Sequence, residues 1–296
     1  MKQPSIQCIQ IGDLPALQIN NQLASAAVLL QGGQLIQFQP HDSAPLLWEN
    51  PDAQFQQGKA VRTGIPICWP WFGDLNCNPK PVQNEFQKLT TQPAHGFART
   101  GTWGLYDYNS HEAGTTLHLK LLDTPCPLHL GLEIEIGEKL SVRLITHNLS
   151  QKTIHFSQAL HSYFPTQNIS ETSIHGLDNC EYLDAMDGWK KKHQTGSVTF
   201  SEETDRVYFG GMENLIIMRG NGQKAESQNT LIESSGSASC VVWNPWKEKA
   251  ARLSQFSPEA YQSMLCVETA NAASDSIKLV EGATHTLSLS LSRLLS

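Results

Sequence analysis

The chain has 296 residues, of which 40% are hydrophobic and 17% are charged, and its formal net charge at pH 7 is -7. This composition is typical of a globular protein with a sizeable core, and the acidic balance without clustered lysine and arginine argues against a nucleic-acid surface. No stretch reaches the ~18 consecutive apolar residues of a membrane helix and the first residues lack a secretory signal, so we expect a cytoplasmic protein that binds no membrane.

Alternation of apolar and polar residues is the main pattern in the first half of the chain. After a segment at 74–93 that is rich in Asn, Gln, Pro and Lys, and that we predict to be irregular, residues 115–121 (TTLHLKL) alternate as a strand does. Residues 132–136 and 140–144 repeat the pattern on either side of a short turn that contains Gly137. These two runs therefore predict a β-hairpin with one apolar face.

The second half of the chain continues with short β-rich runs between turn-forming residues. The three lysines at 190–192 are interpreted as a solvated loop, and 219–237, rich in Gly, Ser, Asn and Gln, as a surface excursion. Strands are predicted at 207–209, 215–218, 239–243, 264–268 and, with its leucines facing a core, 287–292. Many short strands without an internal repeat predict an all-β sandwich with few short helices.

Length and cysteine spacing bear on the number of domains and on possible cofactors. Large β-sandwiches often exceed 200 residues, so we expect residues 1–296 to form a single domain. The seven cysteines are widely spaced and contain no CxxC pair, which suits neither a disulfide framework nor a zinc site. We interpret them as reduced, mostly buried thiols, and we predict no metal ligands. A dinucleotide or Walker loop is also absent from the sequence.

The segment 62–73 (RTGIPICWPWFG) is the first with unusual chemistry. Prolines, glycines and three aromatic residues follow Arg62. Because each proline removes a hydrogen-bond donor from a β-ladder, the segment cannot be a regular central strand. It is either the rigid rim of a pocket with a placed cation or a packed loop with an incidental surface arginine.

A second segment, 95–99 (HGFAR), contains His95 and Arg99. On a strand or an extended loop, a spacing of four would place both side chains on the same side. Either residue alone has a structural explanation. Together with Arg62, however, Arg99 is consistent with a convergent anion site, because a guanidinium binds anions bidentately.

Two further segments place a histidine and a carboxylate in apolar surroundings. Residues 159–165 put His161 and Tyr163 on the same side of a strand, and Glu268 lies in the run CVETAN at 266–271. A core histidine bonded to backbone, or a glutamate paired with Lys or Arg, would explain each residue without chemistry. Desolvation should raise the pKa of Glu268 toward the neutral range that suits a general base.

These segments together resemble a known family. The motifs are, in chain order, Gly32-Gly33, RTGIPICWPWFG, HGFAR, HSYF at 161–164, DRVY at 205–208, VVWNPW at 241–246 and CVETAN. Their combination is similar to the aldose 1-epimerase (galactose mutarotase-like) superfamily, and most similar to its hexose-6-phosphate 1-epimerase branch. Each motif alone is weak, but the order over residues 30–295 is specific.

The resemblance implies a large antiparallel β-supersandwich with a sugar site on an open concave face. It also implies catalysis by a histidine and a glutamate without a metal or organic cofactor. The catalytic histidine of the family matches His161 in HSYF, and its catalytic glutamate matches Glu268 in CVETAN.

The same resemblance implies a set of substrate-binding residues. Arg62 and Arg99 match the arginines of the phosphosugar branch, and His95 in HGFAR is a further expected contact. The aspartate that binds sugar hydroxyls matches Asp205 in DRVY, with Asp184 as a weaker match.

The expected reaction is the exchange of α and β anomers of a small sugar phosphate, with Glu268 as base and protonated His161 as acid. We expect the protein to be a monomer or a weak homodimer. Two alternatives stay open. The first is an aldose 1-epimerase for unphosphorylated hexoses, in which the arginines anchor protein groups. The second is a noncatalytic carbohydrate-binding protein, in which His161 and Glu268 only form hydrogen bonds.

Overall fold

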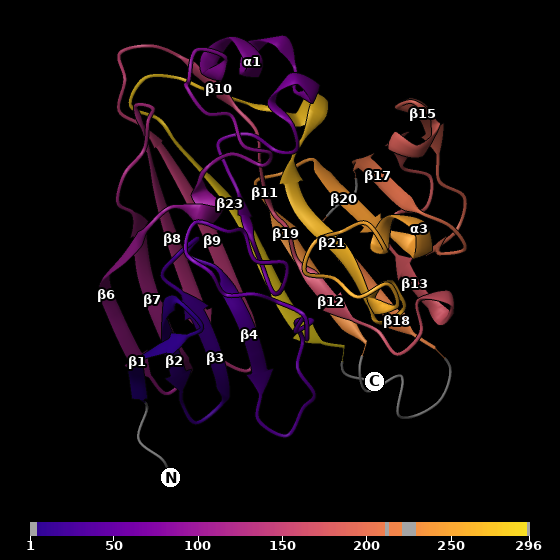
Figure 1. Cartoon of the computed structure of the whole chain (residues 1–296), viewed down its shortest axis with the longest axis horizontal. Helices are drawn as coiled ribbons and strands as arrows, with labels where there is room; N and C mark the ends of the chain where they lie inside the picture. Colours follow the sequence, from indigo (N-terminus) through magenta and orange to yellow (C-terminus); the bar gives the residue numbers. More distant parts are fainter. Residues whose placement is uncertain (1–4, 211–212, 221–228, 295–296) are drawn as a thin grey trace.

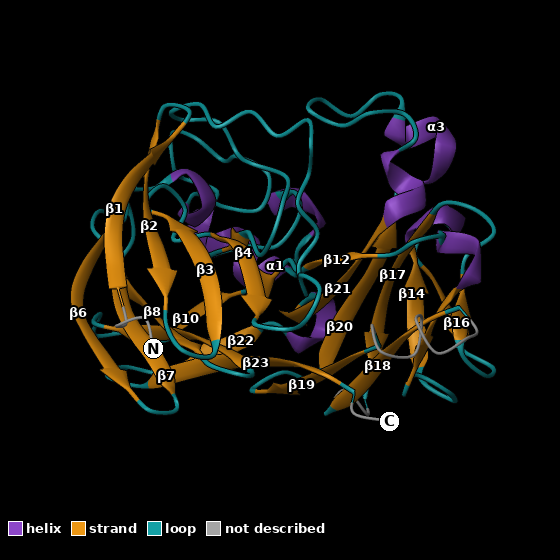
Figure 2. Cartoon of the chain, turned by 90° about the horizontal axis from the view of Figure 1, so that it is seen from below, coloured by secondary structure: helices purple, strands orange, loops and turns teal. Residues whose placement is uncertain are grey.

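The computed structural model describes residues 5–210, 213–220 and 229–294, and it shows an antiparallel β-sandwich (Figure 1). One layer is a nine-stranded sheet. A four-stranded and an eight-stranded sheet together form the other layer, and a continuous cluster of buried apolar residues from all three sheets fills the space between the layers. In Figure 2, β7, β23 and β19 of the nine-stranded sheet run along the lower side, with β3, β4 and β12 above them. The predicted all-β sandwich is confirmed.

The nine-stranded sheet has the order β16-β13-β18-β19-β23-β9-β8-β7-β6. Its strands are β6 (Trp103–His111), β7 (Gly114–Leu121), β8 (Leu128–Ile136), β9 (Leu140–Asn148), β13 (Thr172–His175), β16 (Val198–Thr199), β18 (Asn214–Arg219), β19 (Thr230–Ser235) and β23 (Thr284–Arg293). Strands β8 and β9 form the predicted hairpin, in which Ile136 pairs with Leu140. The leucines of β23 are buried as predicted, because they face the core between the layers.

The four-stranded sheet was not predicted from the sequence. It has the order β1-β2-β3-β4, with β1 (Ser5–Ile11), β2 (Leu14–Asn20), β3 (Ala24–Leu29) and β4 (Leu35–Pro40). Strand β3 shows why, since Ala26 and Val28 pack into the main core while Ala27 and Leu29 pack into a second apolar cluster on the other face. A strand that is buried on both faces has no alternation to detect.

The eight-stranded sheet has the order β15-β14-β17-β20-β21-β11-β5, with β12 also paired to β21. Its strands are β5 (Ile67–Cys68), β11 (Gln158–Leu160), β12 (Tyr163–Pro165), β14 (Glu181–Asp184), β15 (Lys190–His193), β17 (Thr204–Phe209), β20 (Ser239–Asn244) and β21 (Met264–Asn271). All eight residues of β21 are buried. Strands β10 (Ile154–Phe156) and β22 (Ile277–Leu279) form a separate pair.

Helices are few and short in the described residues, as predicted. They are α1 (Lys80–Phe86) and α3 (Trp246–Ala250), with 3-10 turns at Leu75–Cys77, Ala98–Thr100, Ile169–Glu171, Ala185–Asp187, Ala260–Ser263 and Ala273–Asp275. None of these helices is long and apolar enough to cross a membrane.

Three local predictions were wrong. The segment 74–93 is not irregular throughout, because α1 forms there and buries Val82 and Phe86, four residues apart on one helix face. The lysines at 190–192 belong to edge strand β15, where they form ion pairs with acidic neighbours, rather than to a loop. The excursion at 219–237 contains strand β19, while its residues 221–228 lie outside the described residues.

The cysteines are all free thiols. Cys68, Cys240 and Cys266 are buried, whereas Cys8 and Cys77 are exposed, so the expectation that most are buried was wrong.

Candidate functional site

The centre of the candidate site is Glu268 in the middle of β21. Because side chains alternate along a strand, Leu265 and Val267 point into the core between the layers, and Cys266 and Glu268 point to the opposite face. Residues of loops and short helices, among them Trp48, Ala250 and Phe256, pack against that face. Glu268 is only 1% exposed, so its carboxyl group lies at the bottom of this face rather than at its rim.

His161 reaches Glu268 from the short break between β11 and β12. Its backbone N–H donates to the carbonyl of Pro66, which fixes the chain at this point. The imidazole stacks on the ring of Tyr163, with centroids 4.9 Å apart, and meets the edge of Trp243. The His161 Nε2 atom lies 3.4 Å from Glu268 Oε1. The predicted shared side for His161 and Tyr163 is therefore confirmed.

The pair keeps two polar atoms without partners. His161 Nδ1 and Glu268 Oε2 are buried and have no hydrogen-bond partner in the described residues. Buried polar groups in proteins are nearly always paired, so unpaired ones need an explanation. A polar ligand with hydroxyl groups would supply the missing partners.

Burial shifts the pKa values of both members of the pair. It raises the pKa of Glu268 well above its usual value, with a smaller contribution from the carboxylate of Asp205. It lowers the pKa of His161 to about 3, and the positive charges of Arg62 and Arg99 act in the same direction. Burial therefore favours the neutral form of both groups, with the proton on Glu268. The carboxyl proton of Glu268 can then transfer to the imidazole of His161, as coupled acid and base catalysis requires.

Arg62 and Arg99 lie beside the pair. Both line a pocket of about 180 Å³ together with His161 and Tyr163, and Lys59 adds a third positive charge at the same pocket. The Tyr163 hydroxyl hydrogen-bonds the Arg62 side chain, so one aromatic ring contacts both an arginine and the imidazole. The two arginines converge as the sequence predicted, and this favours the pocket-rim interpretation of segment 62–73.

His95 and Arg99 share that pocket, but not for the reason predicted. The segment is neither a strand nor extended, because His95 and Gly96 have φ of 65° and 70° and Arg99 lies in a 3-10 turn. Gly96 is required here, since a Cβ atom would lie 2.1 Å from the carbonyl oxygen of Trp69. The His95 Nδ1 atom accepts a hydrogen bond from Gly73 N–H, and burial lowers its pKa.

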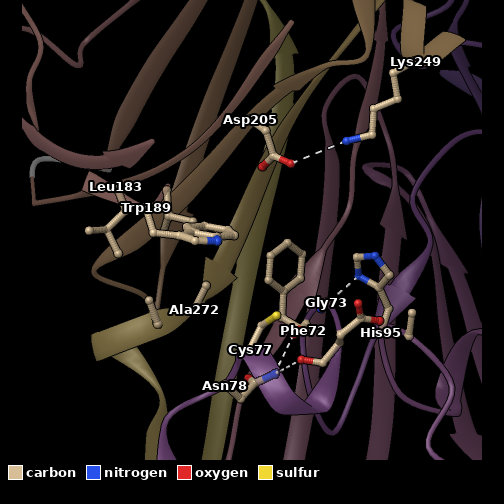
Figure 3. A pocket seen from close by; sticks show the side chains of 14 residues that line it. Phe72, Gly73, Cys77, Asn78, His95, Leu183, Trp189, Asp205, Lys249 and Ala272 are labelled. Carbon is tan, nitrogen blue, oxygen red and sulfur yellow. Dashed lines mark hydrogen bonds and ion pairs between the residues drawn. The ribbon is translucent and has the colours of Figure 1, made fainter. Parts of the chain in front are cut away.

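A larger pocket of about 660 Å³ adjoins the first through His95, which lines both (Figure 3). Asp205 and Lys249 turn toward one another in it, with 4.0 Å between the carboxylate and the ammonium group. Burial raises the pKa of Asp205, while Lys249 opposes this shift. The rings of Phe72 and Trp189 also line the pocket, so it offers charged, hydrogen-bonding and aromatic surfaces together.

Asp184 does not belong to this site. It pairs in register with Arg206, the neighbour of Asp205 on β17, and therefore lies on the opposite face of the sheet. Its carboxylate forms a 2.8 Å ion pair with Lys192 and accepts the N–H of Met186. The weaker sequence match for Asp184 was wrong as a site residue.

Sequence reasoning missed several pocket residues. Lys249 comes from the short helix α3, and Lys59 and Gln255 come from irregular segments, so no periodic pattern marked them. Trp189 has a left-handed backbone conformation, with φ of 62°, which the sequence does not reveal. The assignment of Asp205, in contrast, is consistent with its position in the larger pocket.

Comparison with known proteins gives an independent assignment. The model of the family described as aldose 1-epimerase matches residues 15–292. A curated protein of Escherichia coli K12 described as "Putative glucose-6-phosphate 1-epimerase" is 27% identical over 278 residues, which cover 91% of this chain and 87% of that protein. The resemblance seen in the sequence motifs is confirmed.

Solved structures agree with this assignment at the level of the fold. A Salmonella typhimurium protein described as "a putative mutarotase" has a TM-score of 0.84 at 24% identity, covering 97% of this chain and 92% of that chain. A Lactobacillus acidophilus protein described as a galactose mutarotase related enzyme has a TM-score of 0.70 at 13% identity, with coverage of 95% and 97%. The expected galactose mutarotase-like supersandwich is confirmed.

Proposed function

Because this chain belongs to the aldose 1-epimerase family, we propose that it interconverts the α and β anomers of a hexose 6-phosphate. The observation that carries the proposal is the 3.4 Å contact between His161 and Glu268 beside a pocket that Arg62 and Arg99 line. The description of the Escherichia coli relative as a glucose-6-phosphate 1-epimerase makes glucose 6-phosphate the first substrate to test.

The proposed mechanism needs one acid and one base. Glu268, as a carboxylate, takes the proton of the anomeric hydroxyl while the C1–O5 bond breaks, and His161, as an imidazolium, gives a proton to the ring oxygen O5. The product is the open-chain aldehyde. Rotation about C1–C2 presents the other face of the carbonyl. Reclosure with the two roles exchanged returns each proton and forms the other anomer.

Phosphate binding at the two arginines would also influence whether His161 or Glu268 carries the proton. Burial lowers the pKa of His161, and the charges of Arg62 and Arg99 lower it further. A phosphate dianion bound between them would offset their charge and raise the pKa of His161. The proton then moves more readily from Glu268 to His161, which produces the carboxylate and imidazolium forms that ring opening requires. A neutral sugar leaves the arginine charges uncompensated.

The larger pocket supports binding of the sugar ring. His95, Asp205 and Lys249 provide donors and acceptors for hydroxyl groups, and the rings of Phe72 and Trp189 provide apolar surface. Sugar sites of this kind combine a few fixed polar groups with a largely apolar lining. We therefore assign substrate binding to Arg62, Arg99, His95 and Asp205, as the motifs indicate, and add Lys249.

The deciding experiment is an anomer-exchange measurement by NMR exchange spectroscopy at fixed enzyme concentration. Glucose 6-phosphate should exchange well above its spontaneous rate, and above the enhancement seen with glucose or galactose. Equal enhancement of the exchange rates of glucose and glucose 6-phosphate would favour an aldose 1-epimerase for unphosphorylated hexoses. Binding of either sugar without any enhancement would favour a noncatalytic carbohydrate-binding protein.

A further inference from the structure

The proposed mechanism leaves one thiol beside the pair without a role. Cys266 is fully buried and lies two residues before Glu268 on the same face of β21. His161, Cys266 and Glu268 each offer a ligand atom, and these atoms all lie within 4.8 Å of one another. Imidazole, thiolate and carboxylate are the three ligand types that zinc accepts in proteins.

The distances within this triad suit a tetrahedral ion. Zinc bonds of ~2.0–2.3 Å place neighbouring ligand atoms about 3.3–3.7 Å apart at tetrahedral angles. The separation of 3.4 Å between His161 Nε2 and Glu268 Oε1 already falls in this range. The other separations between ligand atoms are at most 4.8 Å. Side-chain rotations that shorten them by about 1 Å would bring the three ligand atoms to three positions of a tetrahedral site.

A second observation, independent of the spacing, is the buried Glu268 Oε2 atom without a hydrogen-bond partner in the described residues. Glu268 is 1% exposed, so this oxygen lies away from the protein surface. A cation that the Glu268 carboxylate holds through both of its oxygens would satisfy Oε2 as well as Oε1. The fourth corner would face the pocket that His161 lines, so the ion would keep an open, exchangeable position.

The charges around the triad set a limit on affinity. A thiolate and a carboxylate together balance a divalent ion, and Asp205 is close enough to influence Glu268. Arg62 and Arg99 oppose the ion from the neighbouring pocket. The site has three ligands, an open fourth position and two nearby arginines. We therefore expect an ion to bind it reversibly rather than permanently as a structural metal.

We propose that a thiol-binding divalent cation such as zinc binds to His161, Cys266 and Glu268. Its binding reversibly inhibits the enzyme. Binding replaces the thiol proton of Cys266 and the carboxyl proton of Glu268, so two protons leave for each ion. The ion occupies both groups that ring opening requires, and inhibition is therefore competitive with the sugar. Thiolate ligation favours zinc and cadmium over magnesium and calcium. The inhibition rests on the proposed function, whereas the binding of the ion does not.

The test uses the full-length chain with Cys8→Ser and Cys77→Ser, which removes its two exposed thiols. In this background, zinc inhibition of anomer exchange and the visible absorption of bound cobalt(II) are measured with Cys266→Ala and Cys266→Ser. Cys68→Ala, which removes another fully buried thiol near Glu268, is the matched control.

We expect EDTA to reverse zinc inhibition, and magnesium at the same concentration to have no effect. Both Cys266 variants should keep the basal exchange rate but need at least about tenfold more zinc for half inhibition, and should lose the cobalt–thiolate absorption. The control should behave as the parent. Equal zinc sensitivity in the parent and in both Cys266 variants would overturn the site. So would the lack of a cobalt signal in the parent, which can be seen even if no anomer exchange is detected.

Discussion

The ring of Tyr163 stacks on His161 at a centroid distance of 4.9 Å while its hydroxyl hydrogen-bonds Arg62. One side chain thus joins the proposed phosphate site to the proposed acid. Tyr163→Phe keeps the stacked ring and loses only the hydrogen bond. It should raise KM for glucose 6-phosphate about tenfold or less and leave kcat nearly unchanged, as expected for one lost hydrogen bond to a charged group.

Tyr163→Leu removes the stacked ring as well, so His161 loses its support and kcat should fall too. The measurement is the split between kcat and KM in the two variants. If Phe and Leu lower kcat equally, the ring does not position His161.

The acid and base are tested by Glu268→Gln and His161→Ala. Each should lower the exchange rate of glucose 6-phosphate by about two orders of magnitude or more, because general acid and base assistance is worth about 10²–10⁴-fold. NMR exchange rates and circular dichroism spectra are compared with those of Glu233→Gln, a partly exposed carboxyl group on β19. A folded variant of Glu268 or His161 with a near-normal rate would remove that residue from the mechanism.

The arginines separate a phosphosugar substrate from a neutral one. Arg62→Ala and Arg99→Ala should each lower kcat/KM for glucose 6-phosphate about ten- to a hundredfold, which corresponds to losing a charge-assisted contact of about 1.5–3 kcal/mol. Most of the loss should fall on KM, and added salt should weaken the parent in the same direction.

The rate with unphosphorylated glucose is the internal control in these two variants, and it should barely change. A parent enzyme without preference for glucose 6-phosphate, or a preference that survives both changes, would give the arginines a structural role.

Asp205 and Asp184 form a matched pair of carboxylates on opposite faces of one sheet. Asp205→Asn should raise KM for the sugar, because Asp205 lines the larger pocket, whereas Asp184→Asn should leave kinetics unchanged. Asp184→Asn should instead lower the melting temperature, since it breaks the ion pair with Lys192 and weakens a turn. Kinetic damage from Asp184→Asn equal to that from Asp205→Asn would contradict this assignment.

Glu268 should also make stability depend on pH. Its folded pKa lies above the unfolded value of about 4.3, so the folded protein binds the proton more tightly. That stabilisation is complete below the unfolded pKa. It is lost as pH rises toward the folded pKa, by up to about 1.4 kcal/mol per unit of pH.

Glutamine at this position mimics the protonated acid and does not titrate. Glu268→Gln should therefore gain stability relative to the parent between pH 5 and pH 8, as measured by urea unfolding at each pH. Parallel stability profiles for the two proteins would show that the carboxyl group is not held protonated by the fold.

The strands that the sequence predicted best have one face in the core and one in solvent. The hairpin of β8 and β9 is the clearest case, whereas β3 is buried on both faces and carries no period-two signal. Motif resemblance identified His161 and Glu268, but their 3.4 Å contact depends on pairing across the sheet.

Local patterns also could not choose between Asp184 and Asp205. The register of β14 against β17 decides which of the two faces the pocket, and a register is a property of two strands rather than one. Lys249 reaches the site only because helix α3 packs beside it, so no periodicity in its own segment could reveal its position.

Strand β21, which carries Glu268, should be strongly protected from amide hydrogen exchange. Strand β21 is hydrogen-bonded to β20 on one edge and to β11 and β12 on the other, and all its residues are buried. Its amides should exchange only when the whole sheet opens. A sugar phosphate that binds only the folded protein lowers the population of the opened sheet, so it should slow the exchange of β21 through that opening. Additional protection by direct contact would appear in the loops that carry Arg62, His95 and Gln255.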